Sequence, residues 1–255
     1  MRDYLVFRLY APLSSWGDIA VGEVRPSWPY PTKSAILGLL AAARGIRRDE
    51  RDDLDKLRSG YAVAVRVLTP GIPMRDYHTI QRPRQEWIGK GKAKRLKTYA
   101  TRHDELADEE LLNCTQSTRD YYSDAIHDVA VWAVTSPPPW TLDALKEKIE
   151  KPVFCLYLGR KSCPPALPLR PQMVRQAPTL RAAFAGAEFP DKELLSPLLD
   201  LNQRKHPRIQ VSWDESAESG YTEVHRVTRR DDPLDRERWQ FLERQECYAT
   251  ENLED

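Results

Sequence analysis

The sequence predicts an α+β protein: a ferredoxin-like or RRM-like sheet with a protruding basic thumb hairpin and a small β-rich C-terminal lobe. Over residues 1–160, segments typical of strands and helices follow in the order β, α, β, insertion, β, α, β, which suits such a sheet. The insertion falls in the middle β–β connection, at about residues 79–116, and is rich in Lys and Arg. Residues 161–255 differ in character and are expected to form the C-terminal lobe.

Strands are predicted where β-forming side chains dominate or apolar residues alternate. In the first 160 residues these segments are Tyr4–Tyr10, Tyr61–Leu68, Val129–Val134 and Val153–Leu158. Arg75–Ile80 is expected to start a further strand that leads into the insertion. Ile209–Trp213 and Thr222–Thr228 predict two strands of the C-terminal lobe.

Thr32–Gly45 is the clearest helix, since a threonine can cap its start and a glycine can end it. Apolar residues lie nearly all around it, so it should be deeply buried. Asp49–Ser59 predicts a short polar helix and Thr141–Ile149 a helix with one apolar face. The connection Ala11–Pro31 is rich in Pro and aromatic residues, and we expect it to pack on the body or on a ligand.

Length and composition exclude several classes of protein. With 255 residues, 41% hydrophobic and 30% charged, the chain can bury a core and is ordinary for a soluble protein. Its start does not resemble a signal peptide, and its longest apolar run, Ala35–Ala43, is far too short to span a bilayer. The four cysteines are scattered without a C-x-x-C pair, so neither a zinc site nor a disulfide framework is indicated. We expect a cytoplasmic protein with no cofactor, no metal and no membrane contact.

Positive charge is concentrated in Arg75–Arg102. This stretch holds nine Lys or Arg and two acids, a net charge of +7, whereas the whole chain carries +1 and the other residues together −6. Tyr77, Trp87 and Tyr99 lie among the bases. Cations attract phosphates and aromatic rings stack on unpaired bases, so the pattern is typical of binding to single-stranded nucleic acid. The alternative is a solvated loop that binds nothing.

A second basic stretch, Lys151–Ala187, contains six Lys or Arg, no acids and six prolines. Within it, Arg160, Lys161 and Ser162 follow Gly159 at a predicted strand end, where cations and a hydroxyl can bond phosphate oxygens. The upstream glycine of a nucleotide P-loop is missing, which excludes that motif. The alternative is an ordinary surface turn.

Further candidates lie near the N-terminus. Free amides at the start of the first helix, beside Lys33 and Ser34, could cradle a phosphate or belong to an ordinary capped helix end. Trp16, Arg25 and Trp28, in the preceding loop, could stack on or bond a nucleic acid, or could be packing residues.

His78 admits two interpretations. A histidine beside Tyr77 and near Lys or Arg could act as acid and base in metal-free RNA cleavage. A lone histidine is more often a structural or ligand-contact group, and Arg75 and Asp76 could simply pair with each other. The remaining histidines show no spacing that suggests metal ligands.

Several motifs occur together in a specific order along the first two thirds of the chain. They are APLSSWG after the first predicted strand, RPSWPYPTKSAILGLLAAARGI, RDYHT and YLGRKSCP. Their order and spacing resemble the CasD-type subunit of the type I-E CRISPR surveillance complex Cascade, which belongs to the repeat-associated mysterious protein superfamily. The last third, from about Ala187, does not take part in the resemblance.

The resemblance implies a function in antiviral defence. Such subunits have an RRM-like fold with a thumb and clamp the 5′ handle of the CRISPR RNA. They cap one end of the Cascade backbone, touch the adjacent backbone subunit and the large subunit, and meet target DNA only indirectly. They are not the processing nuclease in type I-E, although members of the superfamily in another subtype cleave RNA without metal. The segment Gln81–Thr115 is longer and more basic than the family pattern.

The expected RNA-binding residues come from both basic stretches and from the loop and helix near the N-terminus. They are Trp16, Arg25, Lys33, Ser34, Arg75, Tyr77, His78, Arg82, Arg84, Trp87, Lys90, Lys92, Lys94, Arg95, Lys97, Arg160, Lys161 and Ser162. We expect the two basic stretches to converge on one groove. The main hypothesis is a non-catalytic RNA-binding subunit; the alternatives are a metal-independent repeat endoribonuclease using Tyr77 and His78, and a protein–protein adaptor.

Overall fold

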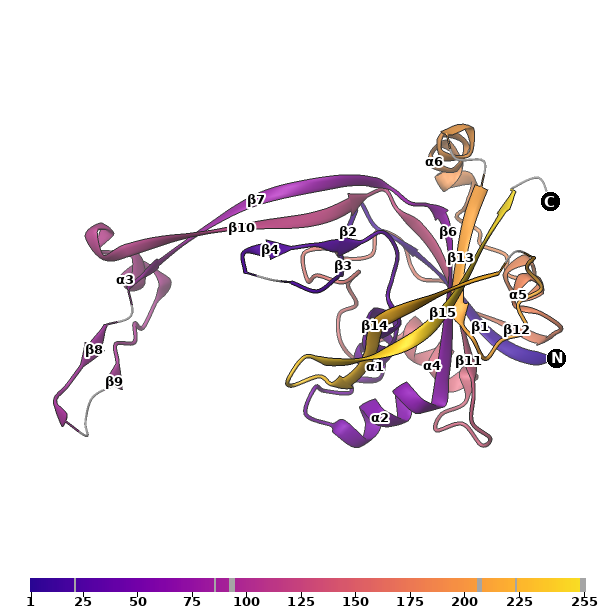
Figure 1. The fold of residues 1–255 in the computed structure, drawn as a ribbon, viewed down its shortest axis with the longest axis horizontal. Coiled ribbons are helices and arrows are strands. Elements are labelled where there is room, and N and C mark those ends of the chain that lie inside the picture. Colours follow the sequence, from indigo (N-terminus) through magenta and orange to yellow (C-terminus); the bar gives the residue numbers. More distant parts are fainter. Residues whose placement is uncertain (21, 85, 92–94, 206–207, 223, 253–255) are drawn as a thin grey trace.

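The computed structural model describes residues 1–255 except 21, 85, 92–94, 206–207, 223 and 253–255. The fold is mixed α/β and rich in sheet. It consists of a body and a long arm, the β7–β10 arm, which covers residues 72–123 and projects from one end of the body (Figure 1). The N-terminus lies on the side of the body away from the arm.

A seven-stranded antiparallel sheet forms the centre of the body, in the order β12-β1-β11-β6-β13-β15-β14. The strands are β1 (Arg2–Tyr10), β6 (Tyr61–Thr69), β11 (Ile126–Ala133), β12 (Gln172–Ala177), β13 (Arg208–Asp214), β14 (His225–Asp235) and β15 (Gln240–Asn252). Strands from both sides of the expected boundary at residue 160 therefore share one sheet, and the boundary itself stays a prediction.

Side-chain alternation builds a hydrophobic core on each face of this sheet. Along β1, Leu5, Phe7 and Leu9 belong to the core under α1, α2 and α4, whereas Tyr4 and Val6 belong to the core that α5 covers. Successive strand residues point to opposite faces, so a strand buried on both faces reads as the continuous apolar run seen in the sequence.

The helices lie outside the sheet, and most begin at a Thr cap or end at a glycine. They are α1 (Lys33–Arg44), α2 (Arg51–Gly60), α4 (Leu142–Glu150), α5 (Leu180–Ala185) and α6 (Lys192–Lys205). At α1, the Thr32 hydroxyl accepts the Ala35 N–H at 3.3 Å and Gly45 ends the helix in the left-handed region, at φ 82°. The predictions of this helix, of its caps and of its burial are confirmed.

The predicted strand at Val153–Leu158 is wrong. The chain there is irregular and runs beside the last turn of α1. Phe154 donates its N–H to the carbonyl of Ala42 at 3.1 Å. The edge of the sheet next to β1 is taken by β12, about twenty residues later in the chain. Only Leu156 and Leu158 of this apolar run contribute to the core, whereas Val153, Phe154 and Tyr157 are exposed.

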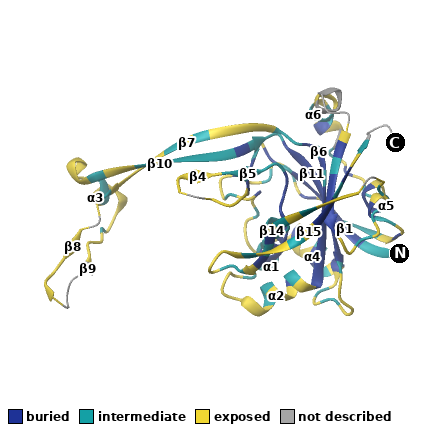
Figure 2. Cartoon of the chain, viewed as in Figure 1, coloured by how far each residue is buried: buried dark blue, intermediate teal, exposed yellow. Residues whose placement is uncertain are grey.

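The β7–β10 arm is a two-stranded antiparallel ribbon built from β7 (Ile72–Pro83) and β10 (Leu112–Ser123). Its ladder runs without a break from the pair Ile72 and Ser123 to the pair Pro83 and Leu112. The residues between, 84–111, form the tip, with β8 (Trp87–Ile88), β9 (Arg95–Leu96), α3 (Arg102–Leu106) and the 3-10 helix η2 (Glu109–Leu111). Most of the arm and tip is exposed (Figure 2), and the insertion expected at about 79–116 lies within this region.

The connection 11–31 packs on the protein itself, which is one of the two alternatives that the sequence left open. It forms the short strands β2 (Leu13–Ser14), β3 (Trp16–Gly17), β4 (Val24–Arg25) and β5 (Ser27–Trp28). β2 and β4 pair with β10 at the base of the arm, and β3 pairs with β5. None of the helices in the described part of the chain is long and apolar enough to cross a membrane.

Candidate nucleic-acid interface

Opposite charges pair across the base of the β7–β10 arm. Arg75 on β7 donates two hydrogen bonds to the Asp120 carboxylate on β10, at 2.7 and 3.1 Å. These bonds hold the pKa of the Asp120 carboxyl below its ordinary value. The pair brings together two positions 45 residues apart, so Arg75 pairs with Asp120 and not with its sequence neighbour Asp76.

The tip carries most of the cations that the sequence indicated. Lys97 pairs with Glu86 at 2.8 Å and lies 5.4 Å from the ring of Tyr99. Among the residues that the structure describes, Arg82 and Lys90 are exposed and have no ion-pair partner. Lys92 and Lys94 lie outside the described residues, and of Arg95 only the backbone is described.

Acidic residues lie next to the cationic tip. The run 104–110 forms α3, η2 and the turn between them, all exposed or half-buried. Over 72–123 the sequence holds ten Lys or Arg and eight Asp or Glu, so the arm as a whole is nearly neutral. Its positive charge is concentrated in the segment from Arg82 to Lys97.

The turn at Gly159 joins the base of the arm to the body. Gly159 has φ +86°, and a Cβ there would lie 1.6 Å from the carbonyl oxygen of Ser15. The close approach that the glycine permits is thus to the protein's own backbone. Arg160 donates to the carbonyls of Asp120 and Arg25 at 3.3 and 2.9 Å and lies 4.6 Å from the ring of Tyr121. Arg160 is therefore held at the base of the arm.

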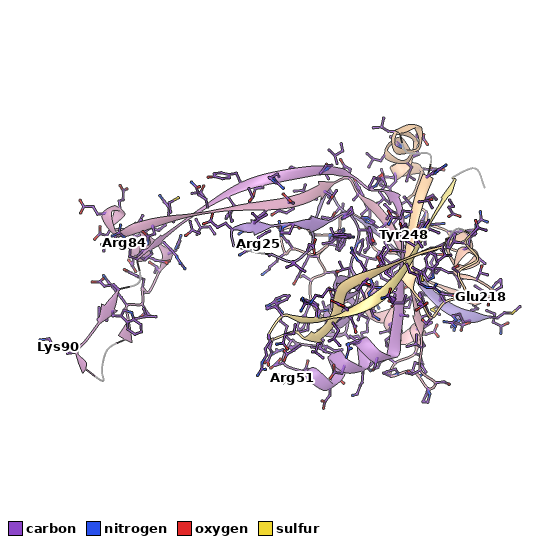
Figure 3. All side chains as sticks on the ribbon, in the orientation of Figure 1. Arg25, Arg51, Arg84, Lys90, Glu218 and Tyr248 are labelled. Carbon is purple, nitrogen blue, oxygen red and sulfur yellow. The ribbon has the colours of Figure 1, made fainter. Side chains whose placement is uncertain are left out.

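The two basic stretches do not meet in one groove, and that prediction is wrong. Arg160 contacts the backbone at the level of the pair Arg75 and Asp120, whereas the tip begins beyond Pro83. Eight residues of extended strand separate these levels, about 26 Å at roughly 3.3 Å per residue. Figure 3 shows Lys90 at the far end of the arm and Arg25, whose carbonyl Arg160 contacts, near the body.

A large groove lies on the body instead. Its volume is about 1560 Å³, and it runs between α1, the loop after β3, the segment 154–161 and the β14–β15 hairpin. Of the predicted site residues, Trp16, Ser34 and Lys161 line it. Its other charged and aromatic lining residues are Asp18, Trp28, Arg47, Arg48, Phe154, Tyr157, Arg229, Arg230, Asp231, Arg236, Trp239 and Phe241.

Most cations of this groove were missed by the sequence analysis. Arg229, Arg230 and Arg236 lie on the β14–β15 hairpin, in the third of the chain that the family resemblance did not cover. Arg47 and Arg48 directly follow the end of α1. The adjacent arginines Arg47 and Arg48, and Arg229 and Arg230, were visible in the sequence. That they line one groove depends on a tertiary contact between segments almost 200 residues apart.

The phosphate cradle expected at the start of α1 is already occupied. The main-chain N–H of Lys33 donates to the Asp231 carboxylate at 2.8 Å, and Lys33 Nζ pairs with Asp214 at 3.2 Å. The Ser34 hydroxyl bonds that of Thr32 at 3.0 Å. A protein carboxylate therefore occupies the place that a phosphate would need, and the side chain of Lys33 is engaged in an internal ion pair.

The predicted aromatic contacts divide between core and surface. Trp16 is 1% exposed and contacts His127 edge to face at 5.9 Å, so it is a packing residue and cannot stack on a ligand in this structure. Trp28 is half-buried, with the guanidinium of Arg229 3.6 Å from its ring centre. Trp87 and Tyr77 are 54% and 61% exposed and are the accessible rings of the arm.

Tyr77 and His78 lie on opposite faces of the β7–β10 ribbon. They are consecutive on β7, so their side chains point to opposite faces of the ribbon. His78 Nδ1 lies 3.9 Å from the Asp76 carboxylate, two residues away on its own face. The Ser162 hydroxyl lies 3.9 Å from the sulfur of Cys163. Arg84 donates to Asn113 at 3.2 Å, near the arm's end.

Comparison with known proteins identifies the family. The family described as "CRISPR-associated protein (Cas_Cas5)" matches residues 4–246. "CRISPR system Cascade subunit CasD" of Escherichia coli (strain K12) is 34% identical over 179 residues, which cover 66% of this chain and 70% of that protein.

Two solved structures share the fold. One, described as "CRISPR RNA-guided surveillance complex", matches with a TM-score of 0.60 and 23% identity over 98% of this chain and 90% of that one. Another, "Crystal structure of Cas protein", has a TM-score of 0.57 and 24% identity over 98% and 94% of the two chains. The match of the family along nearly the whole chain, together with the identity to CasD, settles the relationship: this chain is a member of the Cas5 family of CRISPR-associated proteins.

Proposed function

We propose that the chain is a non-catalytic RNA-binding subunit of a Cascade surveillance complex, which holds the 5′ handle of the CRISPR RNA in antiviral defence in the cytoplasm. The observation that carries this proposal is the β7–β10 arm, which presents exposed cations and accessible aromatic rings at a distance from the body. Membership in the Cas5 family and the identity to a Cascade subunit supply the context.

The order of the strands supports an RRM-like body. The four strands β12-β1-β11-β6, with α1 between the first two in the chain and α4 between the last two, follow the 4-1-3-2 order of a ferredoxin-like module. On this proposal the RRM-like part runs past the expected boundary at residue 160 and includes β12, the β7–β10 arm is its thumb, and the strands after β12 extend the same sheet.

The chemistry suits an unpaired strand. Exposed Lys90 at the tip and Lys161 on the body are cations that can pair with phosphates, and the rings of Trp87 and Tyr77 can stack on splayed bases. A strand that touches both surfaces would run along the arm from its tip to its base. In the view of Figure 1 the tip turns to the same side of the arm as the β14–β15 hairpin.

The partners follow from the same proposal. The arm carries exposed apolar residues on one face of β7, at Ile72, Met74 and Ile80, which is unusual for a ribbon that only faces water. We assign this face to the adjacent backbone subunit, and a surface of the body to the large subunit, with target DNA reached only through the complex.

Binding of single-stranded repeat RNA tests the proposal. Fluorescence anisotropy over a range of NaCl concentrations would compare the wild-type chain with a variant that carries Lys90→Gln and Lys161→Gln. Each lost phosphate contact makes the salt slope shallower by about 0.7, so the double variant should lose roughly 1.4. The matched control carries Lys148→Gln and Lys151→Gln, which remove the same charge from the end of α4.

Two results would contradict the proposal. If the wild-type chain binds RNA as weakly as both variants, the RNA-binding function is contradicted. If nuclease treatment of the native complex leaves the chain and its partners assembled, and no RNA is protected, the chain is a protein–protein adaptor instead.

A further inference from the structure

Arg236 stands out among the arginines of the body groove. It comes from the turn of the β14–β15 hairpin and lies partly buried against α1, where it donates to the carbonyl of Ser34. Its guanidinium covers Gly38, since a Cβ at that position would lie 3.2 Å from Nη1. Within the described residues, it has no carboxylate partner. A glycine of α1 thus makes room for an arginine that no acid neutralises.

The charges around Arg236 leave a net positive site. Six cations line the groove against two acids. Arg229 pairs with Glu246 at 3.5 Å and Asp231 with Arg244 at 2.6 Å, so five cations remain against Asp18. Burial and the nearby charge of Arg48 both lower the pKa of Arg236, which is the direction expected of a cation that lacks an anion. Charge complementarity therefore calls for an anionic occupant.

An aromatic surface lies beside these cations. Trp239 is 57% exposed, and Arg48 covers one face of its indole at 4.9 Å from the ring centre. Arg48 thereby places a second guanidinium of the groove lining against this ring. Phe154 and Tyr157, both exposed, also line the groove. Anion-binding arginines beside an accessible ring are the combination that binds a nucleotide with its phosphate.

We propose that this groove binds one unpaired nucleotide of the RNA strand, with its phosphate on Arg236 and Arg48 and its base on the open surface of Trp239. This inference deepens the proposed function and rests on it. It places a nucleotide site where the β14–β15 hairpin meets the chain just after α1, outside the tip of the arm. An acidic protein segment would also satisfy the cations, but it would leave the exposed rings without a flat partner.

Photo-crosslinking tests the site. Single-stranded RNA with the sequence of the CRISPR repeat, carrying 5-iodouridine at each uridine in turn, would be bound to the full-length chain and irradiated, and adducts mapped by mass spectrometry. We expect an adduct at Trp239 from one position of the RNA. Arg236→Gln and, separately, the exposed Arg48→Gln should each weaken RNA binding roughly tenfold.

Arg238→Gln is the matched control, because Arg238 lies on the same hairpin with an exposed side chain and does not line the groove. Thermal unfolding of each variant separates lost binding from lost folding. RNA that binds with full affinity to the Arg48 and Arg236 variants, with adducts only on the arm, overturns this inference and leaves the proposed function standing. No RNA binding by any form overturns both. Loss of a protein partner from the RNA-free complex in the Arg236 variant assigns the groove to that partner and overturns the inference.

Discussion

The Asp231 carboxylate accepts the main-chain N–H of Lys33 at 2.8 Å, so the start of α1 is bound to strand β14 of the far end of the sheet. The same carboxylate accepts two bonds from Arg244, at 2.6 and 3.0 Å. Arg244 in turn contacts Asp214 and Glu246 at 2.9 and 2.7 Å. The helix dipole, four hydrogen bonds from Arg244 and three buried carboxylates are thus joined in one network.

Asp231→Ala should destabilise the protein strongly. The change removes the anion at the start of α1 and leaves the buried Arg244 with one carboxylate fewer, and breaking a buried pair typically costs about 3–5 kcal/mol. The free energy of unfolding, measured by urea denaturation, checks this. Glu237→Ala is the control, because Glu237 lies on the same hairpin and pairs with Arg51 at the exposed surface. Equal stability of the two variants would show that the network does not hold α1.

Gly159→Ala should disrupt the turn that carries Arg160 and Lys161. The backbone at 159 is in the left-handed region, and the new methyl group would overlap the carbonyl of Ser15. Strain and overlap together should cost at least about 3 kcal/mol. Gly17→Ala is a suitable comparison, since nothing lies within 4 Å of a Cβ there. A stable Gly159→Ala protein with unchanged RNA affinity would contradict the assigned role of this turn.

His127 should make stability depend on pH. Burial lowers its pKa to about 4, against 6.5 ordinarily, although Asp128 and a contact with the Pro29 carbonyl at 3.3 Å oppose the shift. Above pH 6.5 the ring is neutral in both states. Below it His127 binds a proton in the unfolded chain but not in the folded chain, so the free energy of unfolding falls as pH drops. Between pH 7.5 and pH 5 the loss should be about 2 kcal/mol.

The measurement is the free energy of unfolding at several pH values, for the wild type and for His127→Phe. Phenylalanine keeps an aromatic ring against Trp16 but cannot take up a proton. The variant should lose the His127 part of the slope between pH 6.5 and pH 5. Parallel slopes would mean that His127 is not the group responsible.

The parts of the fold that carry strong local signals were predictable. The caps of α1 and the apolar runs of β1, β6 and β11 are short-range patterns, and each gave the right element. Val153–Leu158 failed because a short run of β-forming apolar residues does not distinguish a strand from an irregular segment beside a helix. Which segment pairs with the free edge of β1 depends on long-range tertiary contacts, and in this structure it is β12.

The site was less predictable than the fold. The sequence located the cations of the arm, but it could not show that Lys33 forms an ion pair with Asp214 or that Trp16 is buried. It also missed the groove, since the contact of Arg236 with Gly38 joins positions 198 residues apart. Charge in a sequence indicates binding only where the fold leaves the cation without an internal partner.

No RNA cleavage should depend on Tyr77 or His78. Side chains of consecutive strand residues point to opposite faces, so the two cannot act on one scissile phosphate together. A general base must come within about 3 Å of the hydroxyl that it deprotonates, and a general acid must reach the leaving oxygen on the same substrate. With Tyr77 on one face of the ribbon and His78 on the other, only one of them can face a bound strand.

Incubation of the purified chain with repeat RNA in EDTA separates the two functions. We expect intact RNA for the wild type, and the same for His78→Ala, with RNA affinity changed less than in the variant that lacks Lys90 and Lys161. A sequence-specific cut that disappears in His78→Ala and persists in the neighbouring Thr79→Ala would establish the endoribonuclease. In that case the arm would have to bend or twist on binding RNA, because its extended form keeps the two side chains apart.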